Sequence, residues 1–481
     1  MKIKYYILTL FGALALCSAC SVEDLEPVNE LTEDVVITDA SSANAVLNRV
    51  YNLHRNSGTR PQRTVDMTIG LSLSGIDERI RIPILPEIND YASNQVKEDS
   101  GILLEHYREK YLLINNANYL LEKLKEGAAA DLSEERSLEM QAEARTMRAM
   151  AHFHILRIWG QFYDLYSNLG VVVSLSPLRG ADPIERSTVA DTYKAINDDL
   201  NFAMVNYPDG ATRERYYMSK SFAQALLAKV QLYMGNFTDA AANAKAVIDN
   251  ASDNFELYTS PQNDIWTQKW DNPEVLFAPY AAGRTNNEST AETGKMEFAL
   301  FPSTLLVNLG DESTGAIDGN YDPRINPVLY PWGSVKGYGY DKYPARESDV
   351  TQFNIYYYMR MAEVYLIHAE AEIRKSGGDQ TVALSSLNAV RGRQSVIAKT
   401  WSDKATLLSD IRNEKSLELF TETGEAWFDL IRYHYLDDNF NAFSLKASLN
   451  HEEQFIFPIP LNAIEGNTAL VKNPVVPASG S

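Results

Sequence analysis

Residues 221–249 read SFAQALLAKVQLYMGNFTDAAANAKAVID, with Ala228, Gly235 and Ala240 spaced by seven and five residues. Residues 365–391, YLIHAEAEIRKSGGDQTVALSSLNAVR, repeat this spacing 143 residues later, at Ala371, Gly378 and Ala383. Small residues let two helices pack closely, and glycine turns the chain between them, as in helical-repeat proteins. Alternatively, the two stretches share this spacing by coincidence, because both are alanine-rich and such repeat signatures are degenerate. The spacing favours a fold built of helical hairpins.

Apolar residues with a helical period predict further helices from about Asn44 onward. Short turns join neighbouring helices into hairpins. The predicted helices span 102–125, 133–159, 187–205, 219–234, 237–249, 353–375, 380–393, 403–422 and 425–435. The predicted fold class is therefore mainly α, with tetratricopeptide-like helical hairpins and a loop-rich insert that carries short strands.

The loop-rich insert is predicted over 256–352, where Gly, Pro, Asn and Asp are frequent and no long helical period continues. Within it, VLFAPY at 275–280 resembles a strand. A connection of this length in a compact fold is usually functional or disordered. Between Tyr258 and Tyr343 there are 13 aromatic residues in 86, whereas disordered segments lack aromatics. We therefore expect the insert to be ordered and to bind a ligand.

Aromatic rings provide the candidate ligand-binding residues. Tyr and Trp side chains offer flat apolar faces and a polar tip at little cost in rotamer entropy, which suits stacking against sugar rings. The alternative for each ring is burial in the core, where large aromatics usually lie. The candidates in the insert are Trp332, Tyr330, Tyr338 and Tyr340, and further candidates before it are Tyr91 and Asn94.

Both cysteines of the chain, Cys17 and Cys20, lie near the N-terminus. Two lysines and an apolar run precede them, which is the pattern of a secretory signal peptide over 1–19. Cys20 after Ser-Ala resembles the bacterial lipobox, in which the first mature cysteine is acylated, although Cys17 replaces the usual leucine. Residues 20–40 are interpreted as a lipidated N-terminus and a solvated tether. Two or three acyl chains give a stable anchor.

The net charge of −20 argues against nucleic acid as a partner, because phosphate binding needs a basic stripe. Basic residues occur only in short clusters such as Arg391-Gly-Arg393. Acidic excess does not attract the chain to anionic lipid, so the acyl chains are its expected hold on the membrane. No later apolar run reaches the roughly 20 residues of a spanning helix.

Catalytic and metal-binding patterns are sparse, and no enzyme is predicted. His152 and His154 are two residues apart on a helix and face different sides, so they cannot chelate one metal as an i, i+4 pair would. The carboxylates of Glu363, Glu370 and Glu372 are interpreted as solvated or paired with a neighbouring arginine. The loop DGNYDP at 318–323 imitates calcium ligands but has proline in the glycine position. A weak calcium site stays open there, and no cofactor is predicted.

Six segments taken together resemble one family, the SusD/RagB outer-membrane lipoproteins of Bacteroidetes. They cover almost the whole mature chain in order. The segments are AEARTMRAMAHFHILRIWG (142–160), RSTVADTYKAINDDLNFA (186–203), RMAEVYLIHAEA (360–371), LNAVRGR (387–393), GEAWFDLIR (424–432) and FPIPLNAI with a later NP (457–464, 473–474).

This resemblance implies four tetratricopeptide-like units with a ligand-binding region packed against them. It also implies a surface-exposed, lipid-anchored place on the cell outer membrane. The implied partner is a SusC-like TonB-dependent transporter, over which the protein would sit as a lid. The predicted layout is a signal peptide (1–19), a tether (20–40) and a SusD-like domain (41–481), the latter with helical repeats (41–255, 353–437), the insert (256–352) and a C-terminal extension (438–481).

The chain departs from the family pattern at two places. The family often has Glu-Arg where this chain has Glu414-Lys415, and Glu-Gly-x-Arg where it has Thr423-Gly424-Glu425-Ala426. We interpret these positions as structural ion pairs, whose local geometry the departures put in doubt while the family assignment stands.

Three functions and a purely structural role are weighed for this sequence. A lipoprotein that captures glycan explains the anchor, the aromatic insert and the sparse catalytic groups together. This is the predicted function. Capture of peptides, as RagB-like members imply, explains the same features with another ligand. A surface glycosidase would need two carboxylates about 5–10 Å apart in a cleft. A purely structural helical scaffold would need none of the exposed rings.

Overall fold

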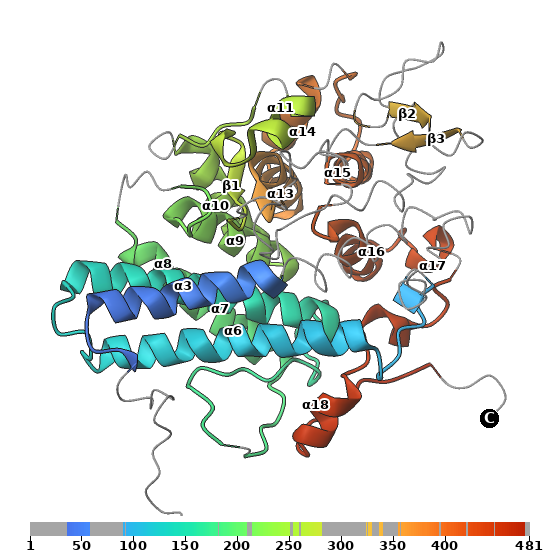
Figure 1. Ribbon diagram of the computed structural model, residues 1–481. Coiled ribbons are helices and arrows are strands. Elements are labelled where there is room, and N and C mark those ends of the chain that lie inside the picture. Colours follow the sequence, from blue (N-terminus) through green and yellow to red (C-terminus); the bar gives the residue numbers. More distant parts are fainter. Residues whose placement is uncertain are drawn as a thin grey trace, which may run out of the picture.

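The computed structural model describes residues 36–57, 90–91, 93–180, 182–208, 214–250, 254–258, 261–280, 324, 326–329, 336–339, 355, 357–393, 396–419, 422–446 and 448–476, the side chains of 55–57, 261–264, 326–329 and 336–339 excepted. These residues form mainly helices, as predicted (Figure 1). Within this described part, no helix has the length and apolarity needed to cross a membrane.

Four long helices form the N-terminal part of the fold: α3 (Ala40–Ser57), α6 (Gly101–Lys125), α7 (Glu134–Trp159) and α8 (Val189–Asn206). Each packs against the next along the chain, and Figure 1 shows α3, α6 and α7 side by side. Hydroxyl side chains begin three of them, because the oxygens of Ser100, Ser133 and Thr188 each accept a hydrogen bond from the backbone N–H three residues on. Helix α7 is buried from Met140 nearly to its end, since neighbours cover it on both sides.

The two repeated stretches are helical hairpins, which confirms the predicted fold class. The first is α9 (Lys220–Tyr233) and α10 (Phe237–Asp249), and the second is α13 (Met361–Arg374) and α14 (Gln380–Gly392). Helix α10 packs against α13, so the hairpins are neighbours in space although the insert separates them in sequence.

The turns of the two hairpins use their glycines differently. Gly235 turns the first with a φ of 77°, a left-handed conformation that favours glycine. In the second, Gly377 takes this role with a φ of 68°. Gly378, the residue aligned by spacing, lies where a Cβ would come within 1.9 Å of the Glu372 carbonyl oxygen. The second glycine is therefore needed for close approach of the backbone.

The C-terminal part contains α15 (Lys404–Glu418), α16 (Glu425–Leu436), α17 (Ala442–Leu445), η4 (Glu452–Phe455) and α18 (Leu461–Gly466). After η4 the chain returns to the N-terminal helices, and Figure 1 shows α18 next to α6. The Phe457 N–H donates to the Ile158 carbonyl over 2.8 Å, and the Asn473 amide donates to the Trp159 carbonyl over 2.8 Å. This extension therefore holds the end of α7 in place.

The described parts of the insert are α11 (Pro261–Gln268), η1 (Lys269–Asp271), β1 (Val275–Phe277), β2 (Asn326–Leu329) and β3 (Lys336–Gly339). Strand β1 pairs antiparallel with β4 (Met359–Arg360), and β2 pairs antiparallel with β3. The strand expected at 275–280 is thus present over its first three residues. The helix expected from 353 begins only at Met361, because the preceding two residues pair with β1.

Candidate functional site

Four aromatic rings lie together where the insert meets the start of α9. We name Tyr216, Tyr217, Trp270 and Tyr280 the aromatic cluster. The Tyr216 ring lies 5.7 Å from Trp270 and 5.1 Å from Tyr280, both edge to face. Trp270 and Tyr280 stack at 5.6 Å with an interplanar angle of 16°. Tyr280 is 46% exposed, and the other three rings are half-buried, so the cluster presents aromatic surface to solvent.

Backbone and side-chain hydrogen bonds hold the segments that carry these rings. The Ala278 N–H donates to the Arg215 carbonyl over 3.0 Å, which joins the end of β1 to the residues before α9. The Arg215 guanidinium donates to the Trp270 carbonyl over 3.2 Å, and the Trp270 indole N–H donates to the Ala278 carbonyl over 3.2 Å. Ser219 then caps α9 by accepting from the Phe222 N–H. The rings are thus positioned before any ligand arrives.

The electrostatics of the aromatic cluster favour a neutral surface. The pKa of the Tyr216 phenol is raised, first by partial burial and then by the nearby Glu214 carboxylate, so it stays protonated at physiological pH. Burial lowers the pKa of Arg215 and of Lys269, against the attraction of Asp271. Neutral rings can stack on C–H faces, and their phenol tips can hydrogen bond to hydroxyls.

Most of the ligand-binding residues predicted in the insert lie outside the part of the chain that the structure describes. Trp332, Tyr330 and Tyr340 lie outside the described residues, as does Cys20. Tyr338 is on β3, where its backbone pairs with Pro327. The role of these residues therefore stays a prediction.

Tyr91 and Asn94 are packing residues in this structure. Tyr91 is 1% exposed, its ring lies edge to face with Phe457 at 5.6 Å, and its hydroxyl lies 2.9 Å from Ser100 Oγ. Asn94 is buried, and its side-chain oxygen accepts hydrogen bonds from Lys446 and Ser448. The expectation of exposure fails for this pair because the C-terminal extension, distant in sequence, folds over both.

Sequence reasoning missed the aromatic cluster. Trp270 and Tyr280 belong to the aromatic-rich insert, but the candidates predicted within it lie further along, between Tyr330 and Tyr340. Tyr216 and Tyr217 lie outside the insert, in the pair directly before α9. The signal that could have indicated this cluster is the adjacent aromatic pair shortly before Ser219, the residue that caps α9.

A buried ion cluster attaches the insert to the helical body. The guanidinium of Arg324 pairs with Glu414 at 2.6 Å and with Glu418 at 3.0 Å. Arg360, which ends β4, pairs with Glu422 at 2.7 Å and also with Glu274, which precedes β1. The basic pair noted in the sequence takes part as well, through the contacts of Arg391 with Glu414 and of Arg393 with Glu274 and Glu418.

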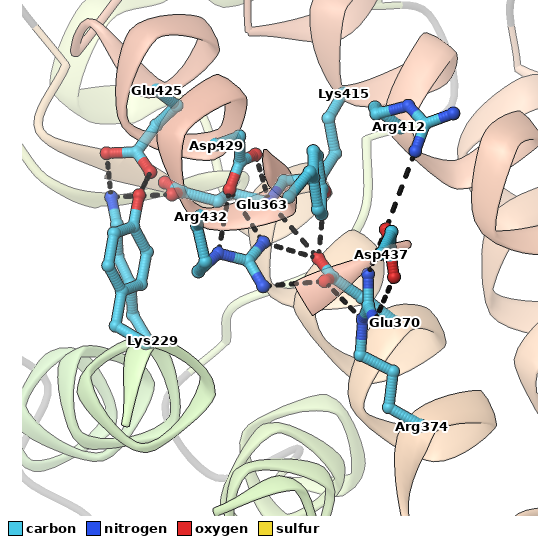
Figure 2. A network of polar contacts seen from close by, with 12 residues as sticks. Lys229, Glu363, Glu370, Arg374, Arg412, Lys415, Glu425, Asp429, Arg432 and Asp437 are labelled. Carbon is cyan, nitrogen blue, oxygen red and sulfur yellow. Dashed lines mark hydrogen bonds and ion pairs between the residues drawn. The ribbon is translucent and has the colours of Figure 1, made fainter. Parts of the chain in front are cut away.

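The three carboxylates on α13 are paired with cations. Glu370 contacts Arg432 at 2.6 Å, Arg374 at 2.8 Å and Lys415 at 3.5 Å, and Glu363 contacts Lys229 at 2.7 Å (Figure 2). Glu372 contacts Lys375 at 2.6 Å. These distances agree with the interpretation of the three carboxylates as ion-paired groups.

Histidine and carboxylate side chains are the remaining candidates for metal binding. Among the residues that the structure describes, no group of three or more His, Cys, Asp or Glu side chains could hold a metal ion. His152 and His154 are both buried in α7, and His154 stacks on His106 at 4.8 Å. Burial lowers the pKa of both, to about 3 for His152. Both histidines are therefore core residues.

Comparison with known proteins agrees with this architecture. The SusD family model matches residues 307–475, and a model described as "Starch-binding associating with outer membrane" matches residues 82–232. A SusD-like protein of Formosa agariphila is 24% identical, over 98% of this chain and 99% of its own length. The chain belongs to the SusD/RagB family.

Solved structures of SusD-like proteins share the fold. A SusD superfamily protein from Bacteroides thetaiotaomicron superposes with a TM-score of 0.74 at 23% identity, covering 91% of this chain and 100% of that one. A laminarin-binding SusD-like protein superposes with a TM-score of 0.73 at 21% identity, again over 91% and 100% of the two chains. At these identities the likeness establishes the SusD-like fold.

Proposed function

We propose that this SusD-like protein is an outer-membrane lipoprotein that binds a glycan at the cell surface and delivers it to a SusC-like TonB-dependent transporter. The observation that carries the proposal is the aromatic cluster, a preformed and partly exposed set of neutral rings beside the insert. Sugar rings present C–H faces to such platforms, and their hydroxyls can bond to phenol oxygens. The laminarin binding of one relative with this fold supports glycan as the ligand class.

The aromatic residues of the insert extend this surface in the proposal. Trp332, Tyr330, Tyr338 and Tyr340 lie in the segment that follows Tyr280, and the buried contacts of Arg324 tie the start of that segment to α15. Rings from both sides of the insert would then contact successive sugars of one chain. The ligand would be bound without chemical change.

The membrane anchor and the partner complete the proposal. Acylation of Cys20 would hold the protein at the outer membrane, with residues 20–40 as tether, in agreement with the outer-membrane description of the matching family model. A lid over a transporter needs such a tether, because the lid must move while it stays attached.

Binding measurements on the mature protein test the ligand class. Calorimetry with laminarin, starch and other polysaccharides would be compared with calorimetry using peptide mixtures. We expect saccharide binding, with an affinity reduced roughly 3- to 10-fold by Trp270→Ala and by Tyr280→Ala, since an aromatic contact contributes about 0.5–1.5 kcal/mol. Tyr166→Ala is the matched control, because Tyr166 is 96% exposed and lies in the connection between α7 and α8.

Two results would overturn the proposal. Binding of peptides alone would leave the RagB-like alternative, and equal affinity in all three variants would remove the aromatic cluster as the site. Hydrolysis of a bound oligosaccharide would instead indicate a glycosidase.

A further inference from the structure

A pocket of about 290 Å³ lies between α15, α16 and α17, lined by residues of the three helices and their connections. Its lining includes the amide and hydroxyl side chains of Asn413, Ser416, Asn439, Asn441 and Ser444. Phe440 and Leu445 supply apolar wall. The volume is near the lower end for ligand sites, which suits a small molecule rather than a long polymer. None of the residues that line this pocket belongs to the aromatic cluster or to the insert, so the pocket is a different site.

Arg412 is a cation at this pocket whose hydrogen-bonding capacity is unused. Its side chain is 22% exposed, and its guanidinium lies 4.4 Å from the centre of the Phe440 ring and 5.4 Å from that of Tyr433. The nearest carboxylate, Asp437, is 3.6 Å away, beyond hydrogen-bond distance. Both Asp437 oxygens already accept from Arg374, at 2.8 and 2.9 Å, from the other side (Figure 2). Within the described residues, no hydrogen bond satisfies the Arg412 guanidinium.

The buried groups behind the pocket leave one positive charge in excess. Eleven charged side chains are linked by ion pairs around Glu370 and Glu425, and we call this set the polar network. Its five carboxylates are Glu363, Glu370, Glu425, Asp429 and Asp437, and its six cations are Arg157, Lys229, Arg374, Arg412, Lys415 and Arg432. Ten of these charges balance. Arg412 and Lys415 line the pocket together with the carboxylates Glu425 and Asp429, and the last three are already paired within the network. Arg412 is therefore the lining charge left to pair with an anionic ligand.

The rest of the lining specifies a polar, hydroxyl-bearing anion. Asn413 and Asn439 side chains make no hydrogen bond to any other described residue, so their amides can donate and accept toward a ligand. The guanidinium of an arginine is a planar fork that can match a carboxylate with two parallel hydrogen bonds. Phe440 can contact a C–H face next to that carboxylate.

We propose that this pocket binds an acidic sugar, a uronate whose carboxylate pairs with Arg412 and whose hydroxyls bond to Asn413 and Asn439. The site is independent of the glycan-binding surface proposed above. It gives the protein a second, charge-selective saccharide site.

The test uses the mature full-length protein with galacturonate and glucuronate as probes, and galactose and glucose as their neutral counterparts. Ligand-detected NMR and calorimetry should show saturable binding of the uronates that weakens with added salt, and much weaker binding of the neutral sugars. Arg412→Gln should lower uronate affinity about tenfold or more, because a two-pronged charged contact is lost. Arg412→Lys should restore part of it, since the charge returns without the fork.

Matched variants separate this site from the proposed glycan surface. Arg179→Gln removes an exposed arginine paired with Glu122, far along the chain, and should leave uronate binding unchanged. Trp270→Ala should also leave it unchanged, while Arg412→Gln should leave neutral-glycan binding unchanged. The melting temperature of each variant checks that it is folded.

Three outcomes would contradict the proposal: no uronate binding, uronate affinity that Arg412→Gln does not alter, or uronate binding that Trp270→Ala abolishes. The last result would move the uronates to the aromatic cluster. Failure of neutral glycans to bind, with uronate binding intact, would overturn only the glycan surface.

Discussion

Arg432 and Glu370 form two parallel hydrogen bonds, of 2.6 and 2.8 Å, although 62 residues separate them in the chain. Both side chains are buried, and the pair joins α16 to α13. Burial disfavours the ionised Glu370, but the attraction of Arg432, Lys415 and Arg374 outweighs it and holds the pKa of Glu370 well below its usual value. The polar network thus connects the second repeat hairpin to the C-terminal helices.

Breaking this pair should be costly. Glu370→Gln removes the buried carboxylate that Arg432, Arg374 and Lys415 share, which leaves excess positive charge in the network, so we expect the free energy of unfolding to fall by about 3–5 kcal/mol. Urea denaturation measures the change. Asp198→Asn is the control, because its pair with Lys194 is exposed and should be worth less than about 1 kcal/mol. A loss as small as that of the control would contradict the structural role of Glu370.

Acid should destabilise the protein partly through the same residue. Because the pKa of Glu370 is lower in the folded than in the unfolded protein, the unfolded state takes up the proton first. The stabilisation is complete above the usual value of 4.5 and is lost as the pH falls below it. Urea midpoints between pH 7 and pH 3 should therefore decline less steeply for Glu370→Gln than for the wild type. Parallel declines would exclude this carboxylate as a contributor.

Glu109 on α6 should have the opposite pH dependence. Burial, and secondly the Glu105 carboxylate, raise the pKa of Glu109 to about 7, so the folded state holds its proton more tightly than the unfolded state. Its ionisation therefore destabilises the protein as the pH rises from 4.5 through 7. Glu109→Gln should stabilise it by about 1 kcal/mol at pH 8, allowing for solvent screening, and have no effect at pH 4. Thermal unfolding at both pH values measures this, with the exposed Glu126→Gln as control.

The second repeat turn should not tolerate a side chain. In Gly378→Ala, the added methyl group would meet the Glu372 carbonyl oxygen, so the backbone must shift, at a cost of about 1–3 kcal/mol in unfolding free energy. Gly101→Ala is the matched control, because a Cβ there meets nothing within 4 Å and the residue begins a helix. We expect the control to be neutral or slightly stabilising. Equal stabilities of the two variants would show that the turn can adjust.

Membrane attachment should depend on one cysteine. Cys20→Ala removes the proposed acylation site, so the protein should leave the membrane fraction and lose incorporated fatty acid, since two or three chains supply the anchor. Cys17→Ala should retain both, because that residue lies in the predicted signal peptide. Cell fractionation and labelling with palmitate distinguish the variants. Membrane retention of Cys20→Ala would indicate another anchor.

Local patterns allowed the helices to be predicted because each is encoded by neighbours in sequence. Apolar periods and the glycine turns located most of the predicted helix boundaries within a few residues. The exception, the start of α13, arose because Met359 and Arg360 pair with β1, a partner some 80 residues away. The spacing of small residues could not show whether Gly377 or Gly378 adopts the left-handed conformation, because both are glycines.

The candidate site was less predictable than the fold. Aromatic content indicated a binding insert, but whether a ring is buried depends on segments that arrive from elsewhere in the chain. Tyr91 illustrates this, because Phe457 covers it. The aromatic cluster illustrates the converse, since Tyr216 meets Trp270 only when the insert folds back onto the start of α9.

The sequence by itself determined the helical hairpins, the acidic character and the membership of the SusD/RagB family, because these reside in short-range patterns and in segment order. Only the tertiary structure decided which rings lie together, which glutamates are neutralised and that Arg412 faces a pocket with its guanidinium unsatisfied. Those properties depend on distances between residues far apart in the chain, and burial and charge balance follow from such distances alone.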